Sequence, residues 1–146
     1  MKVPSRPIVL VMAEDDPEDQ MLVRDAFKEA RLANRLVMVS DGEELMDVLN
    51  RRSGYEDAPR PDMLLVDLNM PRKDGREAIA EIKADPGLRG IPIIVLTTSG
   101  SEEDIAFSYD RGVNSYIRKP VTFDKLVEMV QALGRYWFEI VELPPN

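Results

Sequence analysis

Residues 63–75 read MLLVDLNMPRKDG, and this stretch decides the class of fold. It opens with the apolar run MLLVD, residues 63–67, and then turns through Pro71 and Gly75 into an amphipathic stretch of helical length. A short continuous apolar run is typical of a strand buried on both faces of a parallel sheet, and Pro and Gly mark turns. The segment therefore predicts a strand, a turn and a helix.

The same unit, an apolar run followed by a helix-length stretch, occurs five times along the chain. The other predicted strands are Ile8–Ala13, residues 35–39, residues 91–97 and Ser115–Arg118. This alternation predicts an α/β fold with a doubly wound, five-stranded parallel sheet and five helices. A length of 146 residues fits one domain. We therefore expect a single unit over 1–146, with 134–146 as a C-terminal extension and no output domain.

Local signals place several helix ends. Pro17 suits the first turn of a helix, and residues 40–43, SDGE, read as a capping box. Gly112 predicts a left-handed helix end, and Thr122 or Asp124 begins the last helix.

The composition excludes several kinds of chemistry. The chain has no His and no Cys, so thiolate metal sites, Cys nucleophiles and Ser-His-Asp triads are ruled out. Its 19 basic and 27 acidic residues give a net charge of −8, which disfavours binding to nucleic acid. The longest apolar run, Ile8–Ala13, is far shorter than the roughly 20 residues of a membrane span. We expect a cytoplasmic protein without membrane association.

Four predicted strands end in residues that carry chemistry. The first ends at Glu14 and Asp15, the third at Asp67, the fourth at Thr97 and the fifth at Lys119. In open parallel sheets, ligands bind beyond these strand ends. Clustered carboxylates repel unless a cation lies among them, and an oxygen-only donor set selects a hard ion such as Mg²⁺. With Thr97 and Lys119 to stabilise charge, Asp67 is suited to attack a phosphoryl group.

Each residue taken alone also has a structural interpretation. Acids that follow a strand, such as Asp16 and Asp19, commonly cap helices or occupy their first turn. Lys119-Pro120 reads as a turn, and Thr97 as an ordinary strand-end residue. The combination of four strand ends, each with the needed residue, favours the functional interpretation.

Three motif groups together resemble the receiver domain of two-component response regulators. They are Glu14-Asp15, Asp67 in VDLNMPRKDG with Thr97 in IPIIVLTTS, and Tyr116 with Lys119-Pro120 in SYIRKP. The resemblance covers about residues 7–133. It implies a flavodoxin-like sheet of order 2-1-3-4-5, and it implies that Asp67 accepts phosphate from a phosphohistidine on a sensor kinase. Lys119 and Thr97 would assist that transfer.

The resemblance also implies a metal site. Glu14, Asp15 and Asp67 would hold Mg²⁺, and Asn69 would contribute its backbone carbonyl. Glu14 stands where the family often has Asp, which is a frequent variant. Thr98 stands where the family usually has a smaller residue.

Two further expectations follow from the same resemblance. Thr97 and Tyr116 would form a switch pair, in which Thr97 moves toward the phosphoryl group and Tyr116 turns inward into the vacated space. The peptide bond between Lys119 and Pro120 is expected to be cis, a state that is essentially confined to proline.

The C-terminal segment carries three consecutive aromatics, Tyr136, Trp137 and Phe138. One interpretation is that they cover the edge of the sheet. The other is a homodimer contact, because adjacent aromatics cannot all face one core and exposed apolar patches mark interfaces; on this interpretation Trp137→Ala weakens self-association. The tail and the long loop before the third strand resemble stand-alone response regulators that pair with bacterial phytochromes. That resemblance implies a phytochrome kinase as partner.

Two alternative functions remain. A receiver-fold interaction module that is never phosphorylated would keep the fold, although the intact set of site residues argues against it. A phosphatase resembling the haloacid dehalogenases would also use an Asp nucleophile, but it needs a second Asp two residues later. Here that position is Asn69.

Overall fold

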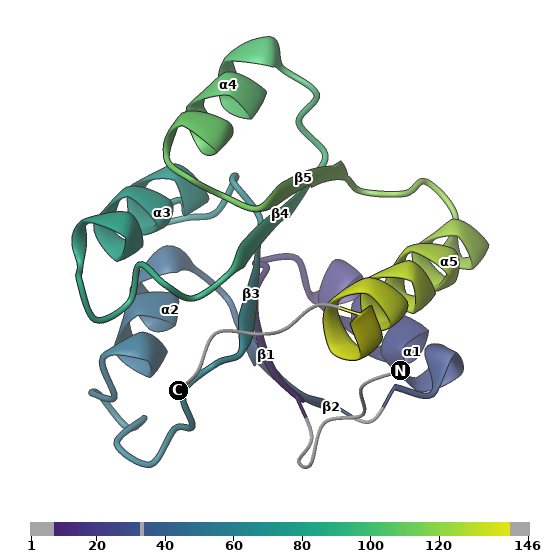
Figure 1. Ribbon diagram of the computed structural model, residues 1–146, viewed down its shortest axis with the longest axis horizontal. Coiled ribbons are helices and arrows are strands. Elements are labelled where there is room, and N and C mark those ends of the chain that lie inside the picture. The colour runs from purple at the N-terminus through teal and green to yellow at the C-terminus, as the bar shows by residue number, and fades with distance from the viewer. Residues whose placement is uncertain (1–7, 33, 141–146) are drawn as a thin grey trace.

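The computed structural model describes residues 8–32 and 34–140, and its centre is one five-stranded parallel sheet of order β2-β1-β3-β4-β5 (Figure 1). This order confirms the predicted topology. The strands are β1 (Ile8–Ala13), β2 (Asn34–Val39), β3 (Met63–Val66), β4 (Ile93–Thr97) and β5 (Ser115–Arg118). The fourth strand begins two residues later than its apolar run, and the carbonyl of Pro92, just before it, accepts from the amide of Leu64.

Helices cover both faces of the sheet, as Figure 1 shows, with α2, α3 and α4 on one side and α1 and α5 on the other. Their bounds are α1 (Pro17–Ala30), α2 (Gly42–Leu49), α3 (Gly75–Ala84), α4 (Glu102–Asp110) and α5 (Phe123–Leu133). A wider π-helical segment, η1 (Gly134–Ile140), continues α5. No helix in the described part of the chain is long and apolar enough to cross a membrane.

The core has two halves, one on each side of the sheet, because successive strand residues point to opposite faces. Along β3, Leu64 and Val66 pack toward α2 and α3, whereas Met63 and Leu65 pack toward α1 and α5. All four side chains are buried. Burial on both faces explains why β1, β3 and β4 read as continuous apolar runs instead of alternating ones.

Side-chain caps begin the helices near the predicted positions. Asp16 caps α1 by accepting from the amides of Glu18 and Asp19, with Pro17 in the first turn. The cap of α2 is Asp41, whose carboxylate accepts from the amide of Glu44, so the cap lies one residue later than the Ser40 that SDGE suggested. Thr122 caps α5.

The peptide bond between Lys119 and Pro120 is trans, so the expected cis bond is wrong; the described residues contain no cis peptide. An X–Pro bond still prefers trans by about 0.5–1 kcal/mol, and the tertiary structure here does not overturn that preference. Gly112 does have a positive φ, of 90°, at the end of α4, as predicted.

The aromatic tail divides between core and surface. Trp137 is 8% exposed and belongs to the core half that α1 and α5 cover, whereas Tyr136 is 54% exposed. Their rings meet edge to face, with centroids 5.4 Å apart. The Trp137 ring thus packs within its own chain. The side chain of Phe138 and residues 141–146 lie outside the described part of the structure.

Candidate functional site: an acidic rim with one lysine

Backbone hydrogen bonds hold the strand ends of the rim together. The amide of Asp67 donates to the carbonyl of Ala13 over 3.0 Å, which places the end of β3 beside that of β1. The amide of Lys119 donates to the carbonyl of Thr97 over 2.8 Å, which places the end of β5 beside that of β4. The parallel register therefore brings residues distant in sequence to one edge.

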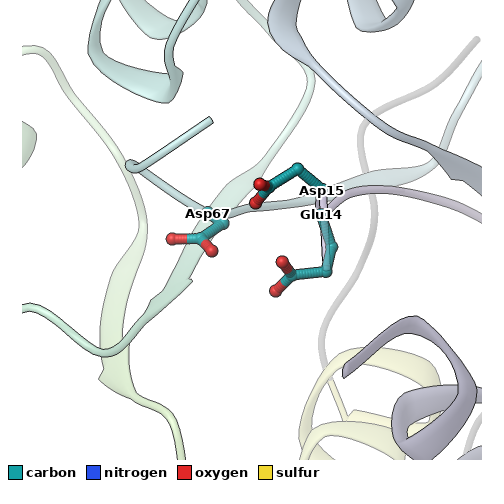
Figure 2. A group of neighbouring side chains, drawn as sticks. All are labelled: Glu14, Asp15 and Asp67. Carbon is teal, nitrogen blue, oxygen red and sulfur yellow. The ribbon is translucent and has the colours of Figure 1, made fainter. Parts of the chain in front are cut away.

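Three carboxylates gather at this edge: those of Glu14, Asp15 and Asp67 (Figure 2). Each offers an oxygen within 4.8 Å of the others. Glu14 and Asp67 are 1% and 5% exposed, while Asp15 is open to solvent. Two of the three acids are therefore buried, and the third is open to solvent.

These acids fit a hard divalent cation. Their donors are all oxygens, and Mg²⁺ is commonly held by one or two carboxylates together with water. Their mutual repulsion in a largely buried position also favours a positive charge among them. The structure thus brings together the three carboxylates that the sequence predicted as Mg²⁺ ligands.

The ammonium of Lys119 places one positive charge among the acids of the rim. Its ammonium donates to Asp67 Oδ2 over 3.1 Å and to Asp19 Oδ2 over 2.9 Å, and it also bonds to the carboxylate of Glu14. An ammonium has three donor hydrogens, so these three acceptors saturate it. Lys119 therefore joins β1, α1 and β3.

Burial and this ion pairing shift two pKa values. Burial raises the pKa of Glu14 to about 7, although the hydrogen bond from Lys119 opposes the shift. Burial alone would lower the pKa of Lys119, but the hydrogen bonds to Glu14 and Asp19 and the charge of Asp67 raise it above its ordinary value. Lys119 therefore stays charged across the physiological range.

The remaining predicted residues lie around this centre. Thr97 is fully buried at the end of β4, and its hydroxyl accepts weakly from the amide of Ser99 at 3.4 Å. Tyr116 is half-buried against the core and donates to the carbonyl of Ser99 over 2.9 Å. The backbone amide of Asn69 donates to Asp67 Oδ1 over 3.3 Å. The structure thus brings the predicted set together, apart from the aromatic tail.

A glycine allows α3 to approach the loop after β3. A Cβ on Gly75 would lie 2.2 Å from the carbonyl oxygen of Asp67, a distance no real side chain tolerates. The amide of Gly75 donates to the carbonyl of Leu68 over 2.9 Å. The absence of a side chain at position 75 lets this turn hold Asp67 at the rim.

Two groups of site residues are not evident from the sequence. Asp19 reads as a first-turn helix acid, yet its carboxylate binds Lys119, which is 100 residues away. Arg76 and Asp104 form an ion pair next to the rim. No local motif marks these residues, because their partners come from other elements.

Comparison with known proteins agrees with this geometry. The model of the response regulator receiver domain family matches residues 9–131. The response regulator Rcp1 of Synechocystis sp. is 42% identical over 138 residues, 94% of each chain, and the crystal structure of its Mn²⁺-bound form superposes with a TM-score of 0.88 over 95% of this chain and all of that one. The phosphorylated cyanobacterial phytochrome response regulator RcpA is 40% identical in sequence. Its crystal structure superposes with a TM-score of 0.89 and covers 95% of this chain and 99% of its own.

A more distant relative is named for another pathway. The probable methanogenesis regulatory protein FilR2 of Methanothrix harundinacea is 36% identical over 132 residues, 90% of this chain and 84% of its own. The chain described here belongs to the response regulator receiver domain family. It is a signalling receiver of the kind found in phytochrome response regulators, and the haloacid dehalogenase interpretation is set aside.

Proposed function

We propose that this chain is a phosphoacceptor in which Asp67 takes a phosphoryl group from a phosphohistidine on a sensor kinase. The observation that carries the proposal is the position of Asp67, which lies beside two further acids and 3.1 Å from the ammonium of Lys119. A nucleophilic carboxylate between a divalent cation and a fixed ammonium is the arrangement that phosphoryl transfer needs.

In the transfer, an oxygen of Asp67 attacks phosphorus as the bond from phosphorus to the histidine nitrogen breaks. The electron pair of that bond returns to the imidazole. Lys119 would neutralise charge on an equatorial oxygen, and Thr97 would donate a hydrogen bond to another. A bound Mg²⁺ supplies further charge neutralisation, and Glu14, Asp15, Asp67 and the carbonyl of Asn69 would hold it. The His-free composition fits, because the donor histidine belongs to the partner.

The same groups would support hydrolysis of the aspartyl phosphate. We expect water to attack phosphorus as the bond from phosphorus to the Asp67 oxygen breaks, while the charges around Asp67 stabilise the transition state. The Asp67 carboxylate leaves with the electron pair of that bond, the protons of the water stay with the inorganic phosphate or pass to solvent, and the chain returns to its resting form. On this proposal the chain is a signalling protein that catalyses its own phosphotransfer and dephosphorylation.

Thr97 and Tyr116 are the proposed switch residues. Thr97 approaches the phosphoryl group, and Tyr116 is held inward through its bond to the Ser99 carbonyl. Their movement would change the surface of β4, β5 and α4, and with it partner binding or dimerisation.

Exposed apolar side chains mark the face from which the donor would approach. Leu22 is 42% exposed on α1, and Val121 and Phe123 are 100% and 38% exposed at the start of α5. They line a pocket of about 70 Å³ that also includes Lys119 and Asp19. A kinase helix that carries the phosphohistidine would cover this apolar surface while it reaches Asp67.

We infer that the kinase is phytochrome-linked, because RcpA is a cyanobacterial phytochrome response regulator of matching fold and length. FilR2 shows that similar chains are also named for another pathway. Phosphotransfer profiling against the histidine kinases of the host, phytochrome-linked ones first, distinguishes the two. The proposal places the chain in the cytoplasm, where ATP-dependent kinases form their phosphohistidine. It involves neither nucleic acid nor a membrane as partner.

We also propose a homodimer through the last helix and the extension 134–146. Tyr136 supports it, since this ring is 54% exposed beside the buried Trp137. Phe138 remains part of the proposed contact. Residues 1–133 would then form the receiver unit proper.

The decisive experiment is incorporation of phosphate from acetyl phosphate with Mg²⁺. Asp67→Asn should abolish labelling, whereas Asp57→Asn, at an exposed acid in the loop before β3, should leave it unchanged. Undiminished labelling of Asp67→Asn contradicts the assignment. No labelling of the wild-type chain by any donor supports the alternative of an interaction module that is not phosphorylated.

A further inference from the structure

An arginine and an aspartate join two helices next to the rim. Arg76, in the first turn of α3, donates from Nε to Asp104 Oδ1 and from Nη2 to Asp104 Oδ2, each over 2.8 Å. Asp104 lies in the first turn of α4, on the same side of the sheet as α3 (Figure 1). Two parallel bonds of this kind fix both distance and orientation, which a single ion pair does not.

The same guanidinium contacts the loop that follows Asp67. Its Nη1 lies 3.4 Å from the carbonyl oxygen of Leu68, and Nη1 and Nη2 each lie 3.4 Å from Asn69 Oδ1. Leu68 and Asn69 are the two residues after the proposed phosphoacceptor. Arg76 therefore touches the loop after β3 with one edge and α4 with the other.

Asp104 continues the connection into the loop between β4 and α4. Its Oδ2 also accepts from the hydroxyl of Ser99 over 2.6 Å. The carbonyl of Ser99 accepts from the hydroxyl of Tyr116 over 2.9 Å, and its amide donates to Thr97 Oγ1 at 3.4 Å. A single residue, Ser99, thus separates Asp104 from both proposed switch residues.

Apolar packing holds α4 only weakly. Ser108 is the only buried residue of this helix, whereas α3 buries Gly75, Ala78, Ile79 and Ile82. A helix with so little buried apolar surface relies on its polar contacts for its position. Among the described contacts, the fork from Arg76 ties α4 to the better-packed α3.

We propose that Arg76 and Asp104 are positioning residues that hold the loop of residues 97–101 so that Tyr116 stays inward, and that they thereby link phosphorylation of Asp67 to α4. This role rests on the proposed function, because it needs Asp67 to carry the phosphoryl group. Without the ion pair, Asp104 is no longer fixed to α3, so its bond to the Ser99 hydroxyl no longer fixes Ser99, and the Tyr116 hydroxyl loses a fixed acceptor. The loop then no longer favours the arrangement that binds a phosphoryl group.

The first test uses beryllofluoride with Mg²⁺ as a phosphoryl analogue on the full chain. Arg76→Gln removes the charge and the fork, and we expect it to weaken beryllofluoride binding about fivefold or more. The control is Arg52→Gln. It breaks another arginine–aspartate bond of 2.8 Å, between Arg52 Nε and Asp47 Oδ1 on α2. Thermal unfolding curves of both variants show whether each remains folded.

A double-mutant cycle separates positioning from general damage. If Arg76 acts through Ser99 on Tyr116, Arg76→Gln should weaken binding in the wild-type background but cause no further loss in Tyr116→Phe. Equal losses in both backgrounds, or no loss in either, overturn the proposal.

A second readout needs no phosphoryl analogue. In the unliganded protein, the ring NMR signals of Tyr116 should shift in Arg76→Gln and stay in place in Arg52→Gln. Unchanged Tyr116 signals in Arg76→Gln also overturn the proposal. A wild-type chain that binds no beryllofluoride contradicts the proposed function instead, and the Tyr116 signals still report on the positioning role.

Discussion

The ammonium of Lys119 lies 3.1 Å from the carboxylate of Asp67, and this bond joins the end of β5 to the end of β3. Lys119 also bonds to Glu14 and Asp19, so its three donor hydrogens are all in use. A phosphoryl oxygen can accept from Lys119 only if one of these partners is released. Asp19 is the one to leave, because its side chain is 34% exposed against 1% for Glu14.

Asp19→Ala should therefore make Lys119 more available. We expect phosphorylation by acetyl phosphate to become about fivefold faster, the equivalent of roughly 1 kcal/mol for a partly exposed charged pair. Glu18→Ala is the matched control, because it removes an exposed acid one residue away with no contact to Lys119 among the described bonds. Equal acceleration in both variants would mean that net charge, not release of Lys119, is responsible.

Mg²⁺ should stabilise the folded chain, since it binds the carboxylates only where the fold assembles them. We expect Mg²⁺ to raise the melting temperature of the wild type and of Glu18→Ala. Asp15→Ala should abolish the effect, because Asp15 is the exposed member of the three acids. Chelation of the metal should return the wild type to its metal-free melting temperature. An unchanged Mg²⁺ response in Asp15→Ala counts against the site.

Gly75→Ala should lower the free energy of unfolding by about 2 kcal/mol, as is usual when a methyl group is forced into a packed position. The new Cβ would meet the Asp67 carbonyl at 2.2 Å. Gly90→Ala is the control, because a Cβ there meets nothing within 4 Å. Urea unfolding of the two variants measures the difference. Equal stability of both would show that the turn after Asp67 yields at little cost.

The long loop before β3 carries a tyrosine whose ionisation reports on its docking. Tyr55 donates to Glu44 Oε2 over 2.6 Å, and this hydrogen bond, with burial, raises the pKa of Tyr55 to about 12. Because the folded pKa exceeds the unfolded value of 10.0, the stabilisation is fully present below pH 10 and is lost as the pH rises through about 12.

Ultraviolet titration of phenolate, with Tyr55→Phe subtracted, isolates this group. Glu44→Gln should move the pKa of Tyr55 back toward 10.0, since the charged acceptor is gone. A Tyr55 pKa that stays near 12 in Glu44→Gln would mean that burial alone causes the shift.

The two aromatic positions before Phe138 should respond differently to truncation. Tyr136→Ser should weaken self-association, measured by sedimentation, with little change in stability. Trp137→Ala should instead lower the free energy of unfolding by about 3–5 kcal/mol, because it empties a core position. Weaker association of Trp137→Ala can follow from its lower stability, so it supports the dimer contact only if Tyr136→Ser also associates more weakly. A wild-type chain that sediments as a monomer contradicts the dimer.

Much of the rim was predictable because each member lies at, or directly after, the carboxyl end of a strand. Glu14, Asp15, Asp67, Thr97 and Lys119 stand at strand ends, and parallel strands place their ends together. The cis or trans state of the peptide bond between Lys119 and Pro120 was not predictable in this way. The cis and trans states of an X–Pro bond differ by only about 1 kcal/mol, so the surrounding packing chooses between them.

The aromatic tail was ambiguous for a related reason. Three adjacent aromatics indicate burial somewhere, but not which ring faces its own chain. The wider π-helical turn of η1 directs Trp137 into the core beside α1 and leaves Tyr136 outside. Neighbouring residues of a helix point in directions about 100° apart, so a small change in the rotation of the last helix decides which of Tyr136 and Trp137 faces the core.

The strand–helix alternation, the acids and lysine at the strand ends and the lack of histidine can all be read from the residues alone. These follow from local periodicity and residue chemistry, which act over a few positions. The bond between Asp19 and Lys119, and the ion pair of Arg76 with Asp104 beside Ser99, became visible only in the folded chain. Such pairings depend on how helices sit on the two faces of the sheet, and side-chain reach across that geometry is not encoded in any short stretch of sequence.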